Sequence, residues 1–278
     1  MPSFQATLPG KPDQMSPIHA AVPYTPNSAA LHAGYGLGDG CSSYGNRNFY
    51  NYYVDWFGSV RGFSVGAYFL DYYAANSSWL GFSTGPMTCG SPDSGCVQSF
   101  SGGLIASSYS TAAAGVHSNY AQIWGWYGRE FGTLGYPASE SRCDNMLNGC
   151  RQEFQGGWIV TFNESDTYVV MQSIRQTWSN WGREYGPLGF PTTSGLVCAD
   201  MGGGACRQEF QGGWIVQNSG VATFVPSAVL DVWKSYGREY DILGFPTSAP
   251  SADTVGGNYT QTFQGGTITV TNGTPTRR

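Results

Sequence analysis

The sequence has little charge and almost no histidine. Charged residues make up 11% of the 278 residues, with 13 Lys and Arg against 18 Asp and Glu, and only 3 residues are His. Proteins that bind nucleic acid through its phosphates need clustered Lys and Arg, so the net charge of −5 argues against such a partner. The sequence also lacks an uninterrupted apolar run of the length that a bilayer requires, so we expect no membrane insertion.

Glycine and aromatic residues are abundant instead. The chain has 40 Gly, and Phe, Trp and Tyr make up 15% of it. So many large apolar side chains are not typical of a disordered chain. Together with the glycines they indicate short strands joined by tight turns.

Two motifs recur along the chain. The first, Leu-Gly-aromatic-Pro with Ser as the last residue of the first copy, occupies residues 80–83, 134–137, 188–191 and 243–246. The second, Phe-x-Gly-Gly-x-Ile, begins at Phe100, Phe154, Phe210 and Phe263. The leucines of the first motif are 54, 54 and 55 residues apart. A fixed period of this size indicates one structural unit copied four times.

Each unit is predicted to combine one helix with two or three short strands. The helices are expected at residues 66–74, 116–127, 167–181 and 227–236, and a Gly follows each of the last three closely, at Gly128, Gly182 and Gly237. The Leu-Gly-aromatic-Pro motif is expected to turn the chain into a hairpin, and Gly-Gly inside a strand pattern indicates a bulge or a close backbone approach. The fold class is therefore α+β with mainly short β-strands.

The chain divides into three parts on these patterns. The proline-containing residues 1–33 are predicted to be an extended arm or linker, and residues 34–65 a capping segment. In the capping segment the aromatic spacing predicts a helix over residues 46–57. The repeat array is expected over residues 66–278, divided into 66–113, 114–166, 167–226 and 227–278.

Six of the seven cysteines occupy the same place in three successive repeats. They are Cys89 and Cys96, Cys143 and Cys150, and Cys198 and Cys206. A zinc site competes with a disulfide in each repeat, but the spacing is not that of a zinc ligand pair and no histidine lies nearby, which favours disulfides. Disulfides imply an oxidising, extracellular location. Cys41 is left over, either as a buried thiol or as a partner for another chain.

The polar motif Gly-Arg-Glu also occurs three times. It holds the candidate site residues Arg129 and Glu130, Arg183 and Glu184, and Arg238 and Glu239. In one interpretation the Arg binds the last carbonyls of its helix or a carboxylate of a neighbouring repeat. In the other, the pair forms hydrogen bonds with sugar hydroxyls.

Two tryptophans follow the Gly-Gly pair at equivalent positions. If the Ile after it points inward, strand alternation turns Trp158 and Trp214 outward, where flat rings could stack on sugars. Packing on the adjacent repeat is the alternative. Gln155 and Gln211 lie nearby and could supply hydrogen bonds to a glycan.

Catalysis is not expected. A catalytic set should occur once, whereas a carboxylate pair such as Glu130 and Glu153 would recur as Glu184 and Glu209. The histidines have no spacing typical of a metal site or a catalytic triad. No cofactor and no metal are therefore predicted.

The paired motifs, Leu-Gly-aromatic-Pro followed by Phe-Gln-Gly-Gly-x-Ile, resemble the LGFP repeat family over residues 66–271. The resemblance implies a non-catalytic module that anchors to the actinobacterial cell wall through arabinogalactan. It also implies a closed, propeller-like ring, which the N-terminal helical segment would complete here beside the four repeats.

The resemblance and the repeats together favour an extracellular carbohydrate-binding protein associated with the cell wall. Its weak single sites would gain strength through multivalency. The alternative is a structural or assembly protein, such as a phage virion decoration or receptor-binding protein, that docks on a larger particle or on other copies through residues 1–33. The first residues lack the features of a signal peptide, so the chain is either a piece of a longer protein or a virion protein released by lysis.

Overall fold

The computed structural model describes residues 18–23, 47–54, 60–144, 146–163, 166–252 and 258–278. Cys41 and the other residues of 1–17, 24–46 and 55–59 in the predicted arm and capping segment lie outside these ranges. The chain forms two compact units. The first runs to Gly132 and includes Tyr136–Glu140, and the second consists of Thr133–Gly135 and Ser141–Arg278.

The first unit contains two antiparallel sheets in its described residues. One sheet has the order β1 (Ile18–Pro23), β2 (Arg47–Val54) and β3 (Val60–Ser64), and the other has the order β4 (Thr88–Ser91), β5 (Gly95–Phe100), β6 (Gly103–Ser107) and β7 (Ala114–His117). The short 3-10 helix η1 (Ala67–Phe69) leads into α2 (Leu70–Leu80), and α3 (Ser118–Trp126) is followed by η3 (Arg129–Phe131). The core of this unit joins Leu70, Tyr73 and Leu80 of α2 to Phe100 and Ile105 of the second sheet.

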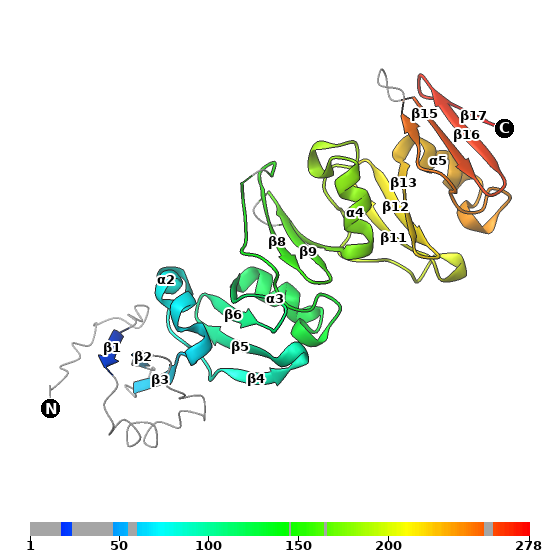
Figure 1. Ribbon diagram of the computed structural model, residues 1–278. Helices are drawn as coiled ribbons and strands as arrows, with labels where there is room; N and C mark the ends of the chain where they lie inside the picture. The colour runs from blue at the N-terminus through cyan, green and yellow to red at the C-terminus, as the bar shows by residue number, and fades with distance from the viewer. Residues whose placement is uncertain (1–17, 24–46, 55–59, 145, 164–165, 253–257) are drawn as a thin grey trace. The chain divides into compact units, whose positions relative to one another are not determined.

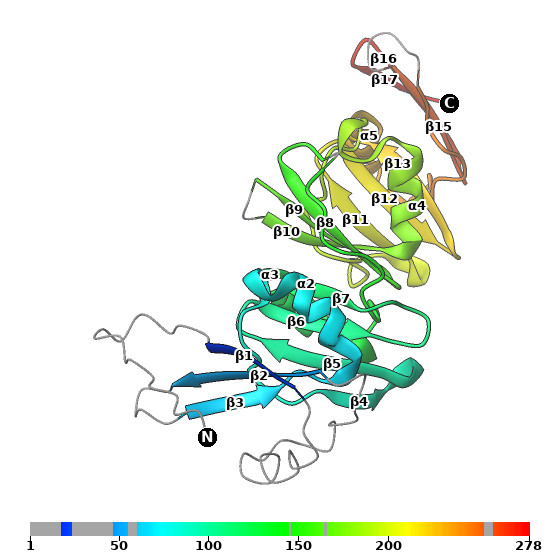
Figure 2. The ribbon, with the colours of Figure 1, turned by 60° about the vertical axis from the view of Figure 1, so that its left-hand side comes forward.

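The second unit alternates sheets and helices (Figures 1 and 2). Its sheets are β8 (Gly149–Phe154), β9 (Gly157–Phe162) and β10 (Asp166–Met171); β11 (Cys206–Phe210), β12 (Gly213–Asn218) and β13 (Val221–Pro226); and β14 (Ser251–Ala252), β15 (Tyr259–Phe263), β16 (Gly266–Thr271) and β17 (Thr274–Arg277). Helix α4 (Gln172–Asn180) packs against the first and second of these sheets, and α5 (Ser227–Ser235) packs against the second and third. Each helix therefore contributes to a core that two successive repeats share.

The shared core is built around one tryptophan from each helix. Trp178 of α4 and Trp233 of α5 are fully buried, and their indole N–H groups donate hydrogen bonds of 2.9 Å to the carbonyls of Gly189 and Gly244. These glycines belong to the Leu-Gly-Phe-Pro motifs. The motif is thus held to the helix that precedes it in the chain.

The predicted helix over residues 46–57 is wrong, because residues 47–54 form strand β2. Tyr, Phe and Val favour strands, so the aromatic residues of this stretch are as compatible with a strand as with a helix. Strand β1 pairs with β2 in the register Ile18 to Tyr52 and Pro23 to Arg47. Residues 18–23 of the predicted extended arm are therefore a strand of a sheet, and residues 47–54 of the segment expected to complete the ring are a strand and not a helix.

The other predicted helices are present with different bounds, and the first of them extends further, to Leu80. The helix expected at 167–181 begins only at Gln172, because residues 166–171 form β10, whose Val169 and Val170 are buried. The helices expected at 116–127 and 227–236 are α3 and α5, and the helix expected at 66–74 is η1 with α2. The class is α+β as predicted. The described sheets are small and antiparallel and none closes into a barrel; the predicted propeller-like ring is not confirmed.

Candidate binding surface and the repeat junction

The three predicted disulfides are confirmed. They join Cys89 to Cys96, Cys143 to Cys150, and Cys198 to Cys206, with Cα atoms 4.1, 4.0 and 4.1 Å apart. Each closes a short hairpin loop that ends in the strand carrying the repeat's Phe. In the oxidised state these loops hold polar groups in fixed positions, and bonds of this kind indicate an oxidising compartment.

Removing one of these bonds gives the first testable prediction. Replacing Cys198 and Cys206 together by serine should lower the free energy of unfolding by about 2–3 kcal/mol, because the bond restricts a short loop in the unfolded chain. Urea denaturation followed by tryptophan fluorescence measures the change. Cys41→Ser serves as the control for cysteine replacement, since it leaves all three disulfides intact. An unchanged midpoint for the double variant would show that the loop is held by its other contacts alone.

The Gly-Arg-Glu motif has the same backbone in all three copies. Gly128, Gly182 and Gly237 have φ angles of 81°, 83° and 76°, and the following arginines have φ angles of 54°, 55° and 60°. A positive φ is uncommon for arginine and costs energy. Its recurrence at the same place shows that the surrounding contacts fix this conformation.

The glutamates of the motif are buried beside their arginines. The side chains of Glu130, Glu184 and Glu239 are 7%, 0% and 1% exposed. Each carboxylate lies 3.3, 3.9 and 3.6 Å, respectively, from the Nε atom of the arginine that precedes it. A carboxylate buried in this way is positioned to organise the backbone around it rather than to meet a large ligand.

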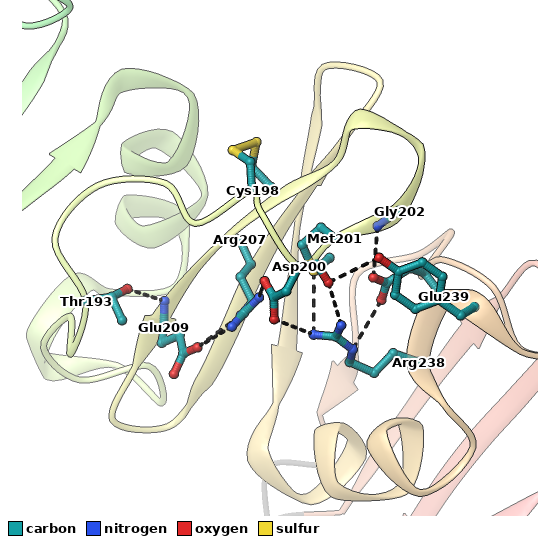
Figure 3. A network of polar contacts seen from close by, with 11 residues as sticks. Thr193, Cys198, Asp200, Met201, Gly202, Arg207, Glu209, Arg238 and Glu239 are labelled. Carbon is teal, nitrogen blue, oxygen red and sulfur yellow. Dashed lines mark hydrogen bonds and ion pairs between the residues drawn. A yellow bond between two sulfur atoms is a disulfide. The ribbon is translucent and has the colours of Figure 1, made fainter.

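The third copy shows what the motif does at a repeat junction (Figure 3). Arg238 donates hydrogen bonds to Asp200 through Nη1 to Oδ2 at 3.3 Å and through Nη2 to the carbonyl oxygen at 2.6 Å. Glu239 Oε1 accepts a hydrogen bond of 3.1 Å from the N–H of Gly202. Asp200 and Gly202 belong to the disulfide-closed hairpin of residues 167–226, the repeat that precedes 227–278 in the division predicted from the sequence. For this copy, the interpretation that the arginine binds a neighbouring repeat's carboxylate is confirmed.

Asp200 connects the two repeats. Its carboxylate also accepts a hydrogen bond from Arg207 of its own hairpin, and Arg207 Nη2 lies 2.9 Å from Glu209 Oε1. The hydrogen bond from Arg207, followed by that from Arg238, holds the pKa of Asp200 below its usual range. The carboxylate therefore stays ionised at neutral pH and keeps both guanidinium groups in place.

The expectation of exposed tryptophans is wrong: Trp158 and Trp214 are only 6% and 7% exposed. Strand alternation does hold, since Ile215 lies in one core cluster and Trp214 in the other. The face that was expected to meet solvent is covered by the helix of the next repeat. Packing on the adjacent repeat, the alternative interpretation, is what the structure shows.

Cationic side chains cover the outer faces of both tryptophan rings. The guanidinium carbons of Arg151 and Arg175 lie 5.1 and 5.0 Å from the ring centroid of Trp158. Arg207 and the Lys234 ammonium lie 4.2 and 4.4 Å from that of Trp214. These are cation–π contacts, and they leave the tryptophan faces no room for a sugar.

The predicted glutamines support the Leu-Gly-Phe-Pro turn. Gln211 Oε1 accepts a hydrogen bond of 3.0 Å from the N–H of Phe190. Gly189 has a φ of +65°, and a Cβ atom there would collide with the same Oε1 atom. Gln155 stands in the same relation to Gly135. Because the glycine of the Leu-Gly-aromatic-Pro motif has no side chain, it leaves room for the glutamine of the Phe-Gln-Gly-Gly motif that follows it.

A set of exposed rings was missed by the sequence analysis. The residue after each Gly-Arg-Glu is aromatic, and Phe131, Tyr185 and Tyr240 are 71%, 56% and 64% exposed. The signal was available, because an aromatic residue recurs there in all three copies. We call Phe131, Tyr185 and Tyr240 the exposed ring positions. Each follows a buried glutamate, so its backbone is fixed although its side chain faces solvent.

The geometry suits the binding of a flat, weakly polar ligand. Tyr240 donates a hydrogen bond of 3.3 Å to the carbonyl of Asp200, and Arg238 lies 5.8 Å from its ring centroid. Arg129, Arg183 and Arg238 stand two residues before the exposed ring positions, and their side chains keep 39%, 23% and 18% exposure. An exposed aromatic ring with an arginine in the same turn is an arrangement that can contact a sugar ring and bind its hydroxyls.

Within the described ranges no helix has the length and apolar content needed to cross a bilayer, and no three His, Cys, Asp or Glu side chains gather as a metal site would require.

No curated protein matches the chain. The sequence model described as LGFP repeat matches residues 80–132, 134–186 and 188–240, more than half of the chain. It finds three repeats where four were predicted, and the copy that starts at Leu243 lies outside the match. The chain belongs to the LGFP repeat family.

Proposed function

We propose that this protein binds the polysaccharide of the actinobacterial cell wall, an arabinogalactan-like glycan, without catalysing its cleavage. The observation that carries the proposal is the exposed aromatic ring at the same position of each matched repeat, Phe131, Tyr185 and Tyr240. Single exposed rings are common on protein surfaces, but these three recur at the same position of successive repeats, which supports a shared role. A single ring contact is weak, but three on one chain gain strength because the second and third contacts are effectively intramolecular.

The charge of the surface fits an uncharged glycan. Charged residues are only 11% of the chain, and the arginines beside the exposed ring positions are already paired with glutamates. An anionic polymer would call for unpaired cationic clusters. The disulfides fit the extracellular location that wall binding needs.

The polar residues predicted from the sequence are proposed to act indirectly. Trp158, Trp214, Gln155 and Gln211 form the scaffold, and the Glu of each Gly-Arg-Glu fixes the turn that presents the ring. The non-catalytic nature of the site is supported by Glu209, whose carboxylate is paired with Arg207, and by the repetition of the motif. Glycoside hydrolysis requires one pair of carboxylates at one site, whereas the repeats carry the same carboxylates several times.

The second prediction tests the exposed ring positions. The triple variant Phe131→Ala, Tyr185→Ala, Tyr240→Ala should lose at least about tenfold in apparent affinity for insoluble actinobacterial wall, since multivalent contacts fail together. Its thermal midpoint should change little, because the three side chains are more than half exposed. Co-sedimentation with purified wall measures the binding, before and after acid removal of the arabinogalactan.

The matched control keeps the number of aromatic replacements similar. Trp126 and Tyr109 are 72% and 91% exposed but lie outside the motif, so Trp126→Ala with Tyr109→Ala should bind the wall normally. Equal binding by the triple variant and the control would contradict the proposal. Assembly of the full chain that is lost when residues 1–33 are deleted, together with wall binding that does not depend on the rings, would favour the alternative of an assembly protein docked through its N-terminal arm.

A further inference from the structure

A groove of about 240 Å³ lies in the second unit, between β12, β13 and the last Leu-Gly-Phe-Pro motif. Its lining includes Phe245 and Pro246 of the motif, with Val216, Asn218 and Thr223 of the strands and Gln264. None of the described side chains that line it is charged. The groove is therefore amphipathic and neutral.

The preceding repeat shows what occupies the equivalent place. Asn218 is the last residue of β12, and Phe162 is the last residue of β9. The ring of Phe162 stacks on Phe190, the aromatic residue of the preceding Leu-Gly-Phe-Pro motif, with centroids 4.2 Å apart and ring planes 24° apart. Thr223 likewise stands where Tyr168 stands in the preceding repeat, opposite Val216 and Val160 in the strand registers.

Two replacements between successive repeats thus open the groove. Phe190 is only 3% exposed under the ring of Phe162, whereas Phe245 is half-buried. The face of Phe245 that a ring would cover in the preceding repeat is accessible in this one. The contact between Phe162 and Phe190 therefore shows how a ring can stack at the equivalent place on Phe245.

We propose that the groove binds one sugar ring, stacked on Phe245 in the place that Phe162 takes on Phe190. This inference rests on the proposed function and adds a site that is distinct from the exposed ring positions. The neutral lining fits an uncharged sugar rather than a phosphate or a uronic acid. Its volume is below the roughly 300–1,000 Å³ of sites for drug-sized ligands, which fits a single ring of a longer glycan.

Polar groups in the lining can bind the hydroxyls of that ring. Gln264 Oε1 accepts a hydrogen bond of 2.9 Å from the N–H of Phe245, a bond that does not use the amide nitrogen of Gln264. Asn218 offers an amide, and Thr223 and Thr247 offer hydroxyls. A purely aliphatic ligand would leave these groups without partners, so it would bind less well than a sugar.

The third prediction tests this site with Asn218→Phe in the full chain. The new side chain should stack on Phe245 as Phe162 stacks on Phe190, so the thermal midpoint should stay the same or rise while the groove is filled. In the wild type, oligosaccharides prepared from wall arabinogalactan should shift the side-chain amide NMR signals of Asn218 and Gln264 in a saturable way. In the variant, the saturable shift of Gln264 should be lost.

Two further variants keep the test decisive. Phe245→Leu keeps an apolar side chain but removes the ring face, and it should weaken the saturable shifts several-fold. Asn180→Phe makes the same replacement at an exposed position of α4, away from the groove, and should leave the shifts unchanged.

The outcomes separate this site from the proposed function. If the oligosaccharides leave the groove signals of the wild type unchanged, or shift Gln264 equally in Asn218→Phe, the groove site is overturned even where the wall is bound. Saturable shifts in a protein that does not sediment with the wall would keep the groove site and overturn wall binding. A sugar-independent self-association that Asn218→Phe abolishes would assign the groove to a second copy and overturn the inference.

Discussion

Replacing Trp178 by alanine should lower the free energy of unfolding by about 3–5 kcal/mol. The ring is fully buried on α4 between two sheets. Its centroid lies 6.2 Å from that of Trp158 on β9 and 5.8 Å from that of Phe210 on β11. Truncation would leave a cavity that neither sheet can fill without moving the other, because both are braced by disulfide-closed hairpins.

The loss of a hydrogen bond adds to the loss of packing. The indole N–H of Trp178 donates to the carbonyl of Gly189, which would lose this partner. Denaturation in urea, followed by circular dichroism, measures the midpoint and its slope. Trp126→Ala is the control, since Trp126 occupies the preceding helix α3 but is 72% exposed, and it should change the stability by less than about 0.5 kcal/mol. Similar costs for the two variants would contradict the shared core.

The local features of the fold could be predicted from the sequence. The period of the two motifs, the cysteine pairs and the glycine at the end of each helix all depend on residues close together in the chain, where short-range geometry decides the outcome. Cys198 and Cys206 are an example: their sequence separation is only 8, so each thiol lies within reach of the other. Helices α3 and α5 were predicted nearly to their bounds for the same reason.

The burial of the candidate site could not be predicted in this way. Alternation places Trp214 and Ile215 on opposite faces of β12, but it does not say that a helix of the next repeat covers the second face. A sheet with helices on both sides buries both sets of side chains, as parallel sheets in α/β proteins do. Trp158 and Trp214 were therefore assigned to solvent, whereas they lie in the core that successive repeats share.

The exposure of individual side chains could not be predicted from the sequence either. An aromatic residue after Gly-Arg-Glu is equally compatible with a core position, and only the structure shows that Tyr185 and Tyr240 are exposed. The groove beside Phe245 depends on which residue ends each middle strand. The repeated motif aligns Phe162 with Asn218, but the sequence does not show that Phe162 stacks on Phe190 in the folded chain.

Replacing Gly212 by alanine should lower the free energy of unfolding by at least about 3 kcal/mol, a large effect for the addition of one methyl group. Gly212 is the first glycine of its Gly-Gly pair, and a Cβ atom there would overlap the backbone carbonyl oxygen of Pro187. Backbone atoms cannot rotate away as a flexible side chain can. Gly156 and Gly265 meet the carbonyls of Thr133 and Ile242 in the same way, so their replacement should cost as much.

Gly220 supplies the matched control for backbone conformation. It has a φ of +81° with no heavy atom within 4 Å of the added Cβ, so Gly220→Ala should cost only the strain of a left-handed alanine, about 1–2 kcal/mol. Thermal and urea denaturation of both variants separate the two causes. If Gly212→Ala costs no more than Gly220→Ala, the close approach to Pro187 is not what requires glycine in this motif.

The effect of Gly212→Ala should also reach both neighbouring elements. The N–H of Gly212 donates a hydrogen bond of 2.9 Å to the carbonyl of Leu188, and its own carbonyl accepts one of 2.9 Å from Ser227, the first residue of α5. One residue thus joins the Leu-Gly-Phe-Pro turn of its repeat to the helix of the next. Moving it should speed amide hydrogen exchange at the turn and in the first turn of α5 together, whereas Gly220→Ala should speed exchange only beside its own loop. Faster exchange at one of the two elements alone would mean that the repeats are joined through the tryptophan core and not through the Gly-Gly turn.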